Sequence, residues 1–227
     1  MAYLTYNGQY VVSDGKYTSQ APPVTIQALD FDGSTYIQMS EHVALPTSDQ
    51  FDVTFGMYLD TNSYSYESFF FTCDTAGPSP THNCLGVYLL GDQLRVWGGL
   101  GSESRQADIN SFVGANVNVT VSIDTTVGNY NIVDDIKFNG VSQALTVTGE
   151  SFSFEDTFRI GITTTSFASY LQNATMWDLT IPTVGLWKGY PGDQNSGWED
   201  QIGVLDGTLT TVPPGHIAYI QTRPITL

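Results

Sequence analysis

Basic residues are scarce in this chain. Seven Lys and Arg stand against 23 Asp and Glu among 227 residues, so the formal net charge is −16 at pH 7. Proteins that bind nucleic acid draw most of their affinity from neutralised phosphates, and anionic membranes attract basic segments. We therefore expect no nucleic acid and no membrane among the partners. A cation or a basic protein surface is compatible with the charge, although solubility alone accounts for it.

Charged residues of both signs together make up only 13% of the chain, about half the usual share. The polar surface must then come from Ser, Thr, Asn, Gln and Gly, as on many extracellular adhesins and virion proteins. No apolar run approaches the ~18 residues that a membrane span needs. The start of the chain, Met1 to Gly8, has neither the basic residues nor the apolar run of a signal peptide. If the protein reaches an exterior, it does so without its own N-terminal export signal, and assembly inside a cell into a particle later released by lysis would meet that condition.

Patterns that carry catalysis are missing as well. There is no Gly-x-Ser-x-Gly nucleophile motif and no phosphate-binding loop. The acidic pairs Glu155-Asp156 and Glu199-Asp200 are adjacent residues, which a strand would point to opposite faces. The three His (42, 82 and 216) support no other catalytic scheme. We expect a protein that is not an enzyme, with no catalytic residue and no cofactor.

The chain has only two cysteines, Cys73 and Cys84, and they bracket residues 74–83. A disulfide between them would close a small loop and stabilise the protein by about 3 kcal/mol at most. Together with His82 they could contribute to a metal site, but Zn²⁺ takes four ligands, and we expect no metal. Two free thiols fit assembly in a cytoplasm best, and both states stay open at this point.

What the sequence does contain is a succession of short strands between residues 28 and 181. Residues Phe51–Leu59 and Val117–Ile123 alternate apolar and polar side chains, which is the period of a strand with one buried face. Asn139-Gly140 is a hairpin turn signal, and no window has helical spacing. Many short antiparallel strands close most readily into a sandwich, so we predict an all-β fold of two antiparallel sheets. The predicted core contains Phe51, Val53, Phe55, Val119, Val121, Ile123, Phe138, Ile160 and Trp177.

The stretch Ala28–Met39 organises the rest of the chain. Its two apolar runs flank Asp32-Gly33-Ser34, and Asp-Gly favours a turn because Gly takes φ > 0 without steric cost. The expected local structure is strand, tight turn, strand. The phrase Leu29-Asp30-Phe31-Asp32-Gly33 resembles the opening of laminin-G-like (concanavalin A-like) jelly-roll domains.

Three further segments resemble the same family in the same order. They are the early core strand Phe51–Leu59, the hairpin formed by Val117–Ile123 and Phe138–Val141, and the closing pair Phe158–Gly161 and Trp177–Ile181. The resemblance covers residues 28–181 and implies a two-sheet jelly roll. It leaves residues 1–27 as an N-terminal arm and residues 182–227 as a C-terminal extension.

The family resemblance also implies sites that can be sought in this sequence. Some of these jelly rolls are retaining β-glucanases, whose Glu-x-Asp-x-Glu strand supplies two carboxylates ~5 Å apart; no such strand occurs here. Others bind Ca²⁺ at the rim, for which Asp134-Asp135 and Asp30 with Asp32 are conceivable donors. Solvated turns explain these acids better.

Residues 1–27 contain a short repeated pattern that the rest of the chain lacks. Tyr6-Asn7-Gly8-Gln9-Tyr10 is echoed by Ser13-Asp14-Gly15-Lys16-Tyr17, so each copy sets a turn before a Tyr. Such a meander is too small to be stable alone, and Gln20 to Pro23 forms a stiff linker. It is either an ordinary extra hairpin or an arm that docks on a partner. The docking residues would be Tyr3, Leu4, Tyr6, Tyr10 and Tyr17.

Exposed aromatic rings could stack on sugars. Trp187 and Trp198, flanked by Gly and Pro, are the better candidates for glycan binding, with Trp97 as a third and Tyr64 and Tyr66 beside them. We expect the C-terminal residues 182–227 either to complete an edge of the sandwich or to contact a neighbouring protein.

The Tyr-flanked turns and the C-terminal extension look like virion proteins of tailed bacteriophages. This resemblance implies a non-enzymatic protein on the virion surface, as a capsid decoration, head fibre or tail appendage present in several copies. Its partners would be capsid or tail proteins, with a host-surface glycan in addition. The alternative is a carbohydrate-binding module of a cellular adhesin or enzyme complex.

Overall fold

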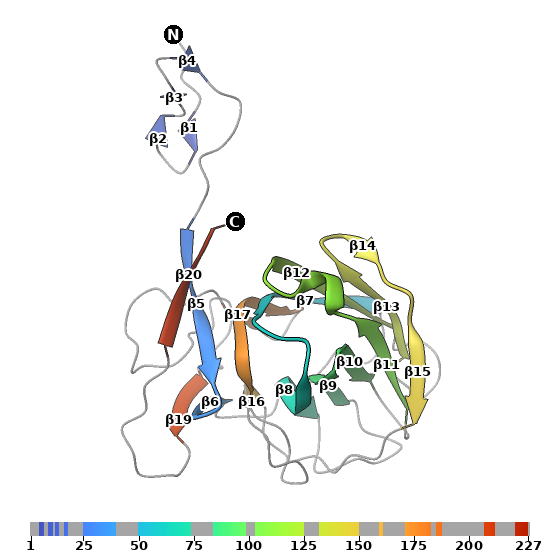
Figure 1. Cartoon of the computed structure of the whole chain (residues 1–227). Helices are drawn as coiled ribbons and strands as arrows, with labels where there is room; N and C mark the ends of the chain where they lie inside the picture. The colour runs from blue at the N-terminus through green and yellow to red at the C-terminus, as the bar shows by residue number, and fades with distance from the viewer. Residues whose placement is uncertain are drawn as a thin grey trace.

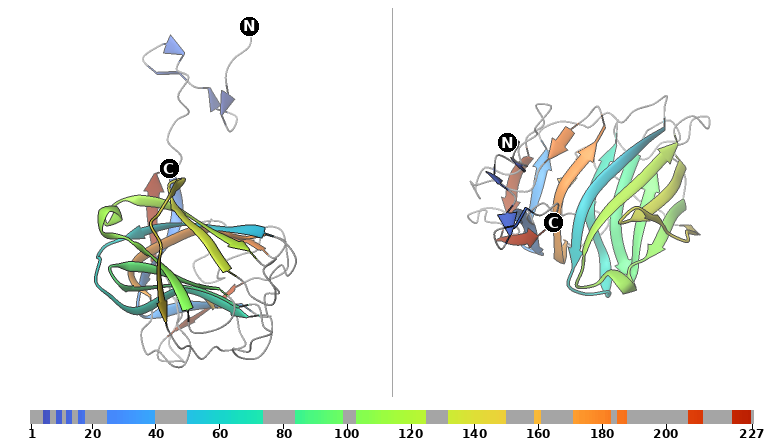
Figure 2. Two further views of the ribbon diagram at one scale, coloured as in Figure 1. Left: turned by 90° about the vertical axis from the view of Figure 1, so that its right-hand side faces the viewer. Right: turned by 90° about the horizontal axis from the view of Figure 1, so that it is seen from above.

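A computed structural model gives the fold of the chain (Figures 1 and 2). The structure describes residues 5–6, 9–10, 12–13, 16–17, 25–39, 50–73, 84–98, 103–124, 132–149, 159–160, 171–182, 185–187, 207–211 and 221–226.

Two antiparallel sheets face each other and confirm the predicted all-β sandwich. We call the first the β7 sheet. Its strands, in spatial order, are β14 (Val141–Ser142), β13 (Ile132–Phe138), β12 (Asn116–Asp124), β7 (Gln50–Leu59), β17 (Gln172–Ile181), β5 (Thr25–Asp32) and β20 (Gln221–Thr226), and β18 (Gly185–Trp187) pairs with β17.

The second sheet, called the β9 sheet, lies below the first in Figure 1. Its order is β15 (Thr146–Gly149), β11 (Glu103–Asp108), β10 (Gln93–Gly98), β9 (Cys84–Gly91), β8 (Tyr64–Cys73), β16 (Arg159–Ile160), β6 (Thr35–Met39) and β19 (Gly207–Thr211). A single 3₁₀ turn, η1 (Asn110–Phe112), precedes β12 and is the one helical element among the described residues.

The alternating strands bury their apolar faces between the sheets as predicted. In β7 every second residue from Phe51 to Leu59 is buried, and β12 repeats the pattern from Val117 to Ile123. All the predicted core residues whose side chains are described are buried, Trp177 among them; Ile160 lies in β16 with its side chain outside the described part. Period-two spacing therefore located the interior correctly except at Trp177, which is buried in a separate cluster outside the space between the sheets.

The Asp32-Gly33-Ser34 turn connects the two sheets instead of closing a hairpin. The strand, turn, strand prediction holds, but β5 belongs to the β7 sheet and β6 to the β9 sheet. Gly33 has φ +82°, and Asp32 Oδ1 accepts a hydrogen bond of 2.9 Å from the Ser34 amide. This Asx turn reverses the chain at the corner of the sandwich.

Residues with a positive φ angle lie where the strands turn or bend. Asn139 (φ +52°) and Gly140 (φ +80°) form the predicted two-residue hairpin between β13 and β14. Tyr66, Asn173 and Asp178 also have φ near +50°, and each lies at a register shift of β8 or β17. Such bulges increase the local bend of a strand.

The β7 sheet curls toward its outer face at the β5–β20 end. Asn116 at the start of β12 donates a 2.9 Å hydrogen bond to the carbonyl of Thr226 at the end of β20. Three strands separate β12 from β20 in the sheet, and a flat sheet would hold them ~19 Å apart at ~4.8 Å per strand. The sheet must therefore fold over itself, and Figure 1 shows β5 and β20 rising past the plane of β7 and β12.

The ends of the chain have different relations to the sandwich. The C-terminal strands β19 and β20 complete the edges of the β9 and β7 sheets, by pairing with β6 and β5. At the other end, β1 (Thr5–Tyr6) pairs with β2 (Gln9–Tyr10), and β3 (Val12–Ser13) pairs with β4 (Lys16–Tyr17). These two small sheets are drawn apart from the sandwich in Figure 1, beyond the start of β5.

Candidate functional site

The point where the N-terminal arm meets the sandwich is the best-built polar site in the described residues. Thr25, the first residue of β5, lies opposite Thr226, near the last residue of the chain. β5 is hydrogen-bonded on one side by β17 and on the other by β20. The first residue of β5 and the last residue of β20 therefore lie side by side.

An apolar cluster supports this point from the outer face of the β7 sheet. Ala28, Trp177 and Ile225 are buried there, and Ile26 and Tyr58 pack against them. Trp177 follows Met176 of the interior core, and successive strand residues point to opposite faces, so its ring lies outside the core. The ring rests on Gly56, its register partner in β7. Trp177 is thus buried as predicted, but in a second cluster.

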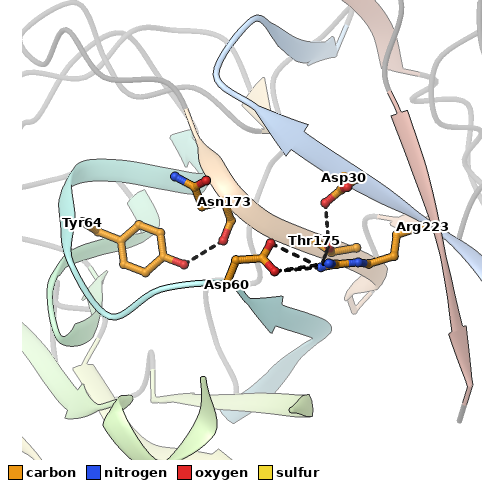
Figure 3. Close-up of polar contacts among 6 residues, drawn as sticks. All are labelled: Asp30, Asp60, Tyr64, Asn173, Thr175 and Arg223. Carbon is orange, nitrogen blue, oxygen red and sulfur yellow. Dashed lines mark hydrogen bonds and ion pairs between the residues drawn. The ribbon is translucent and has the colours of Figure 1, made fainter. Parts of the chain in front are cut away.

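A network of polar side chains closes over this cluster, and we call it the terminal latch (Figure 3). It consists of Arg223 of β20, Asp60 after β7, Thr175 of β17 and Asp30 of β5, all drawn in Figure 3, together with the ring of Tyr58, which that figure does not draw. Arg223 donates to both carboxylate oxygens of Asp60 at 3.2 Å. Thr175 Oγ1 donates to Asp30 at 2.8 Å, and the Arg223 guanidinium carbon lies 4.4 Å from the centre of the Tyr58 ring.

The electrostatics of the latch keep Arg223 charged. Partial burial opposes the charge, but the hydrogen bond and attraction of Asp60 outweigh it and raise the pKa of Arg223. Both partners are partly exposed, so the ion pair contributes about 1 kcal/mol or less. The latch therefore fixes the direction of β20 more than it stabilises the fold.

The Asp60 side of the latch is anchored by one backbone carbonyl. Asn173 C=O accepts a 2.9 Å hydrogen bond from the Asp60 amide and another of 2.9 Å from the Tyr64 hydroxyl. Burial raises the pKa of Tyr64 well above its usual range, so this hydroxyl remains a donor. The bulge at Asn173 thus positions the carboxylate that holds Arg223.

Glu67 of β8 is an acid buried beside the same bulge, with 2% of its surface exposed. Its carboxylate accepts a 3.1 Å hydrogen bond from the Gln172 amide and longer ones from the Gln172 side chain and the Ser65 amide. Desolvation by burial raises the pKa of Glu67 despite these donors. The ionised carboxylate is therefore a cost to the folded state at neutral pH.

We predict that Glu67→Gln gains stability relative to the wild type as pH rises from 4 to 7. A carboxyl whose pKa is raised by folding holds its proton in the native state after the unfolded chain has released it, so wild-type stability falls with pH across that window. The Gln side chain of the variant does not ionise, so the variant lacks this pH-dependent loss of stability. Urea unfolding at several pH values measures the difference between the two proteins.

The same comparison in high salt tests the cause of the effect. Salt screens repulsion among exposed acids but acts little on a buried group. The difference in unfolding free energy between Glu67→Gln and the wild type should therefore depend on pH in the same way in high salt. A difference that is constant with pH would show that Glu67 is not destabilised by ionisation.

Acidic side chains also line a hollow of about 300 Å³ on the outer face of the β7 sheet, at its other end. Asp52, Asp124 and Asp134 contribute the carboxylates. Asp52 accepts a 2.6 Å hydrogen bond from Ser122 Oγ, and Asp124 accepts one of 2.9 Å from Gln50. Within the described ranges, no group of three or more His, Cys, Asp or Glu side chains is arranged to hold a metal ion.

The other acids considered as rim ligands have partners of their own. Asp135 accepts a 2.7 Å hydrogen bond from Ser142 and lies 3.6 Å from Lys137 Nζ. Asp30 belongs to the latch, and Asp32 caps its own turn. These acids serve local structure.

The prediction that Trp97 stacks on a glycan is wrong for this structure. Trp97 points away from the core residue Val96, yet only 2% of its surface is exposed, and a covered ring offers no face to a sugar. Tyr64 is buried as well. Trp187 lies in β18 with its side chain outside the described part, and Trp198 lies outside the described ranges altogether, so their predictions stand as made.

The predicted docking residues fall in or beside the arm strands. Tyr6, Tyr10 and Tyr17 lie in β1, β2 and β4, and their side chains, like Tyr3 and Leu4, are outside the described part of the chain. Cys73 and Cys84 face each other as register partners across β8 and β9. That cross-strand position is within the distance range of a disulfide.

Sequence reasoning missed the residues that build the terminal latch. Arg223 and Asp60 are 163 positions apart, and no local pattern connects them. Gly56 had a signal, because a glycine inside an alternating strand marks a close approach. The signal for Glu67 was weaker, because it consists only of a single acidic residue just before the apolar residues Phe69 and Phe70.

The comparisons with known proteins do not add a family. No family model matches the chain, and no curated protein matches its sequence. Over the part of the chain that is described, there is no helix with the length and apolar character of a membrane span.

Proposed function

We propose that this chain is a non-enzymatic surface protein of a bacteriophage virion, displayed as a capsid decoration, head fibre or tail appendage. The sandwich is the displayed body, and residues 1–27 attach it to a neighbour in the virion, either another virion protein or a second copy of this chain. The observation that supports this most is the separate pairing of β1–β4, next to a strand that is held on both sides. Assembly would take place in the host cytoplasm, with several copies on each particle.

The geometry at the base of the arm suits attachment under load. A pull on the arm acts along β5, whose hydrogen bonds to β17 and β20 lie across the direction of pull and share the load. The terminal latch and the Asn116–Thr226 hydrogen bond keep β20 in place beside β5.

A host-surface glycan is a second partner in this proposal, and it depends on Trp187 and Trp198. A free-standing carbohydrate-binding module is less well supported, because Trp97 and Tyr64 are buried. The proposal of a non-enzymatic role is supported by the internal hydrogen bonds of the acidic side chains, which serve turns, strands and the latch.

Antibodies against the purified protein test the proposal directly. They should label the outside of intact particles released from cells that carry the gene, at many sites per particle, in negative-stain electron microscopy. Serum from before immunisation is the control. Absence of label on intact and opened particles would contradict the proposal.

We also expect the arm to be dispensable for folding and required for attachment. A chain that begins at Thr25 keeps β5 and both sheets, so its melting temperature should lie within ~3 °C of the full chain. The same chain should be missing from particles that incorporate the full-length protein. Unfolding of the shortened chain would show that residues 1–24 belong to the sandwich.

A further inference from the structure

The two sheets end together at a rim whose last strands, β14 and β15, carry no charged side chain. β14 is the last strand of the β7 sheet and β15 the last strand of the β9 sheet, and the chain passes directly from one to the other. Residues 139–149 contain no Asp, Glu, Lys or Arg, in a protein of net charge −16. We call Val141, Val147 and the outer edge of β15 the neutral rim.

Apolar side chains reach the surface at this rim. Val141 is 65% exposed and Val147 52% exposed, and they are the large apolar side chains that the described residues leave exposed. Val141 lies opposite Phe138 of the core. Val147 lies opposite Arg105, which in turn lies opposite the core residue Val96. Both valines therefore continue the inward faces of their sheets beyond the end of the core.

The backbone edge of β15 is also suited to pairing. Its inner side pairs with β11, and within the described ranges no strand pairs with its other side. Edge strands are usually protected by Lys, Pro or a bulge, whereas β15 reads Thr-Val-Thr-Gly. An extended segment can add to such an edge through main-chain hydrogen bonds.

We propose that the neutral rim receives the N-terminal arm, β1–β4, of a second copy of this chain. The inference rests on the proposed attachment role of residues 1–27 and names the partner. The arm pairs only within itself among the described strands, and its strand-forming Tyr and Val residues suit a sheet edge.

Charge favours this pair of surfaces. Two copies of a chain with net charge −16 repel each other over most of their surfaces. Residues 1–27 carry one Asp and one Lys, and residues 139–149 carry no charge. Arm and rim are therefore stretches that can meet without bringing acids together.

The sheet order favours a second copy over the arm of the same chain. β5 and β14 lie toward opposite sides of the β7 sheet, with four strands between them. Figure 2 shows β5 and β20 on the side of the sandwich away from the β14 edge. Pairing between copies is head-to-tail, and it builds rings or chains.

Complementation between two full-length variants tests the inference. Val141→Lys with Val147→Lys disables the rim at exposed positions, and it lowers the net negative charge, so lost association cannot come from added repulsion. Tyr10→Pro with Val12→Pro disables the arm by removing two backbone donors. Ser63→Lys with Ser65→Lys, exposed just before β8 and at its second residue, is the matched control for the added charge.

Light scattering after size exclusion reads the result. The measured mass of the wild type and of the Ser63/Ser65 control should exceed the monomer mass of 24.8 kDa. Each disabled variant should be monomeric, or need at least about ten-fold higher concentration to associate. Mixed in equal amounts they should form a one-to-one dimer and stop there, because only one arm and one rim are intact.

Three outcomes would overturn the inference. They are a monomeric wild type up to about 1 mM, a mixture that stays monomeric, and association that survives in the arm variant but is lost in the rim variant. The last outcome would show rim-to-rim pairing. Antibody labelling of particles is independent of all three, so labelled particles with a monomeric chain would leave the attachment role standing and refute this inference alone.

Discussion

Replacing Gly56 with alanine should lower the free energy of unfolding by about 3 kcal/mol. A Cβ at this position would lie 2.0 Å from Cε2 and 2.1 Å from Nε1 of Trp177, closer than any real contact. The indole is 1% exposed and held between Ala28 and Ile225, so it cannot move aside without losing its packing. Overpacking of this kind costs about 1–3 kcal/mol and occasionally more. Urea unfolding measures the change.

A double-mutant cycle identifies Trp177 as the cause. Trp177→Ala alone should cost about 3–5 kcal/mol, because it removes a large buried ring. In that background Gly56→Ala should be nearly neutral or slightly stabilising, since the ring is gone and Ala suits a strand better than Gly. An equal cost of Gly56→Ala in both backgrounds would show that the strain comes from elsewhere.

The interior of the sandwich could be predicted because its signal is local. The alternation of β7 from Phe51 to Leu59 depends only on neighbouring residues and on the burial of one face. The Asn139-Gly140 hairpin was predictable for the same reason, since two residues determine the turn. The Asp32-Gly33 turn shows the limit. Its chemistry predicts a reversal of the chain but does not say whether the two strands pair or enter different sheets.

The candidate site could not be predicted because it depends on tertiary contacts. The terminal latch joins β20 to Asp60, and only the curl of the β7 sheet brings them together. The position of Trp177 was partly readable. Adjacent apolar residues such as Met176 and Trp177 indicate a strand buried on both faces, but not what covers the second face. Trp97 has the same signal, because it directly follows the apolar Val96, but Gly98 and Gly99 after it resemble an exposed loop.

Phe55→Ala should be at least as damaging as Gly56→Ala, with a loss of about 3–5 kcal/mol in the free energy of unfolding. Phe55 of β7 points into the sandwich and meets two rings of β8. The ring centres of Phe55 and Phe69 are 5.2 Å apart, and those of Phe55 and Phe70 are 5.7 Å apart in an edge-on contact. These contacts join the two sheets, so their removal leaves a cavity between layers that cannot readily close.

Two matched variants make the Phe55 result interpretable. Phe55→Leu keeps much of the apolar volume and should cost clearly less than the alanine variant. Val141→Ala removes apolar atoms from a side chain that is 65% exposed and should change stability by no more than about 0.5 kcal/mol. The urea dependence of the unfolding free energy should be the same for all three variants, because the same surface is exposed on unfolding. A loss below about 1 kcal/mol for Phe55→Ala would mean that the aromatic contacts between β7 and β8 do not hold the sheets together.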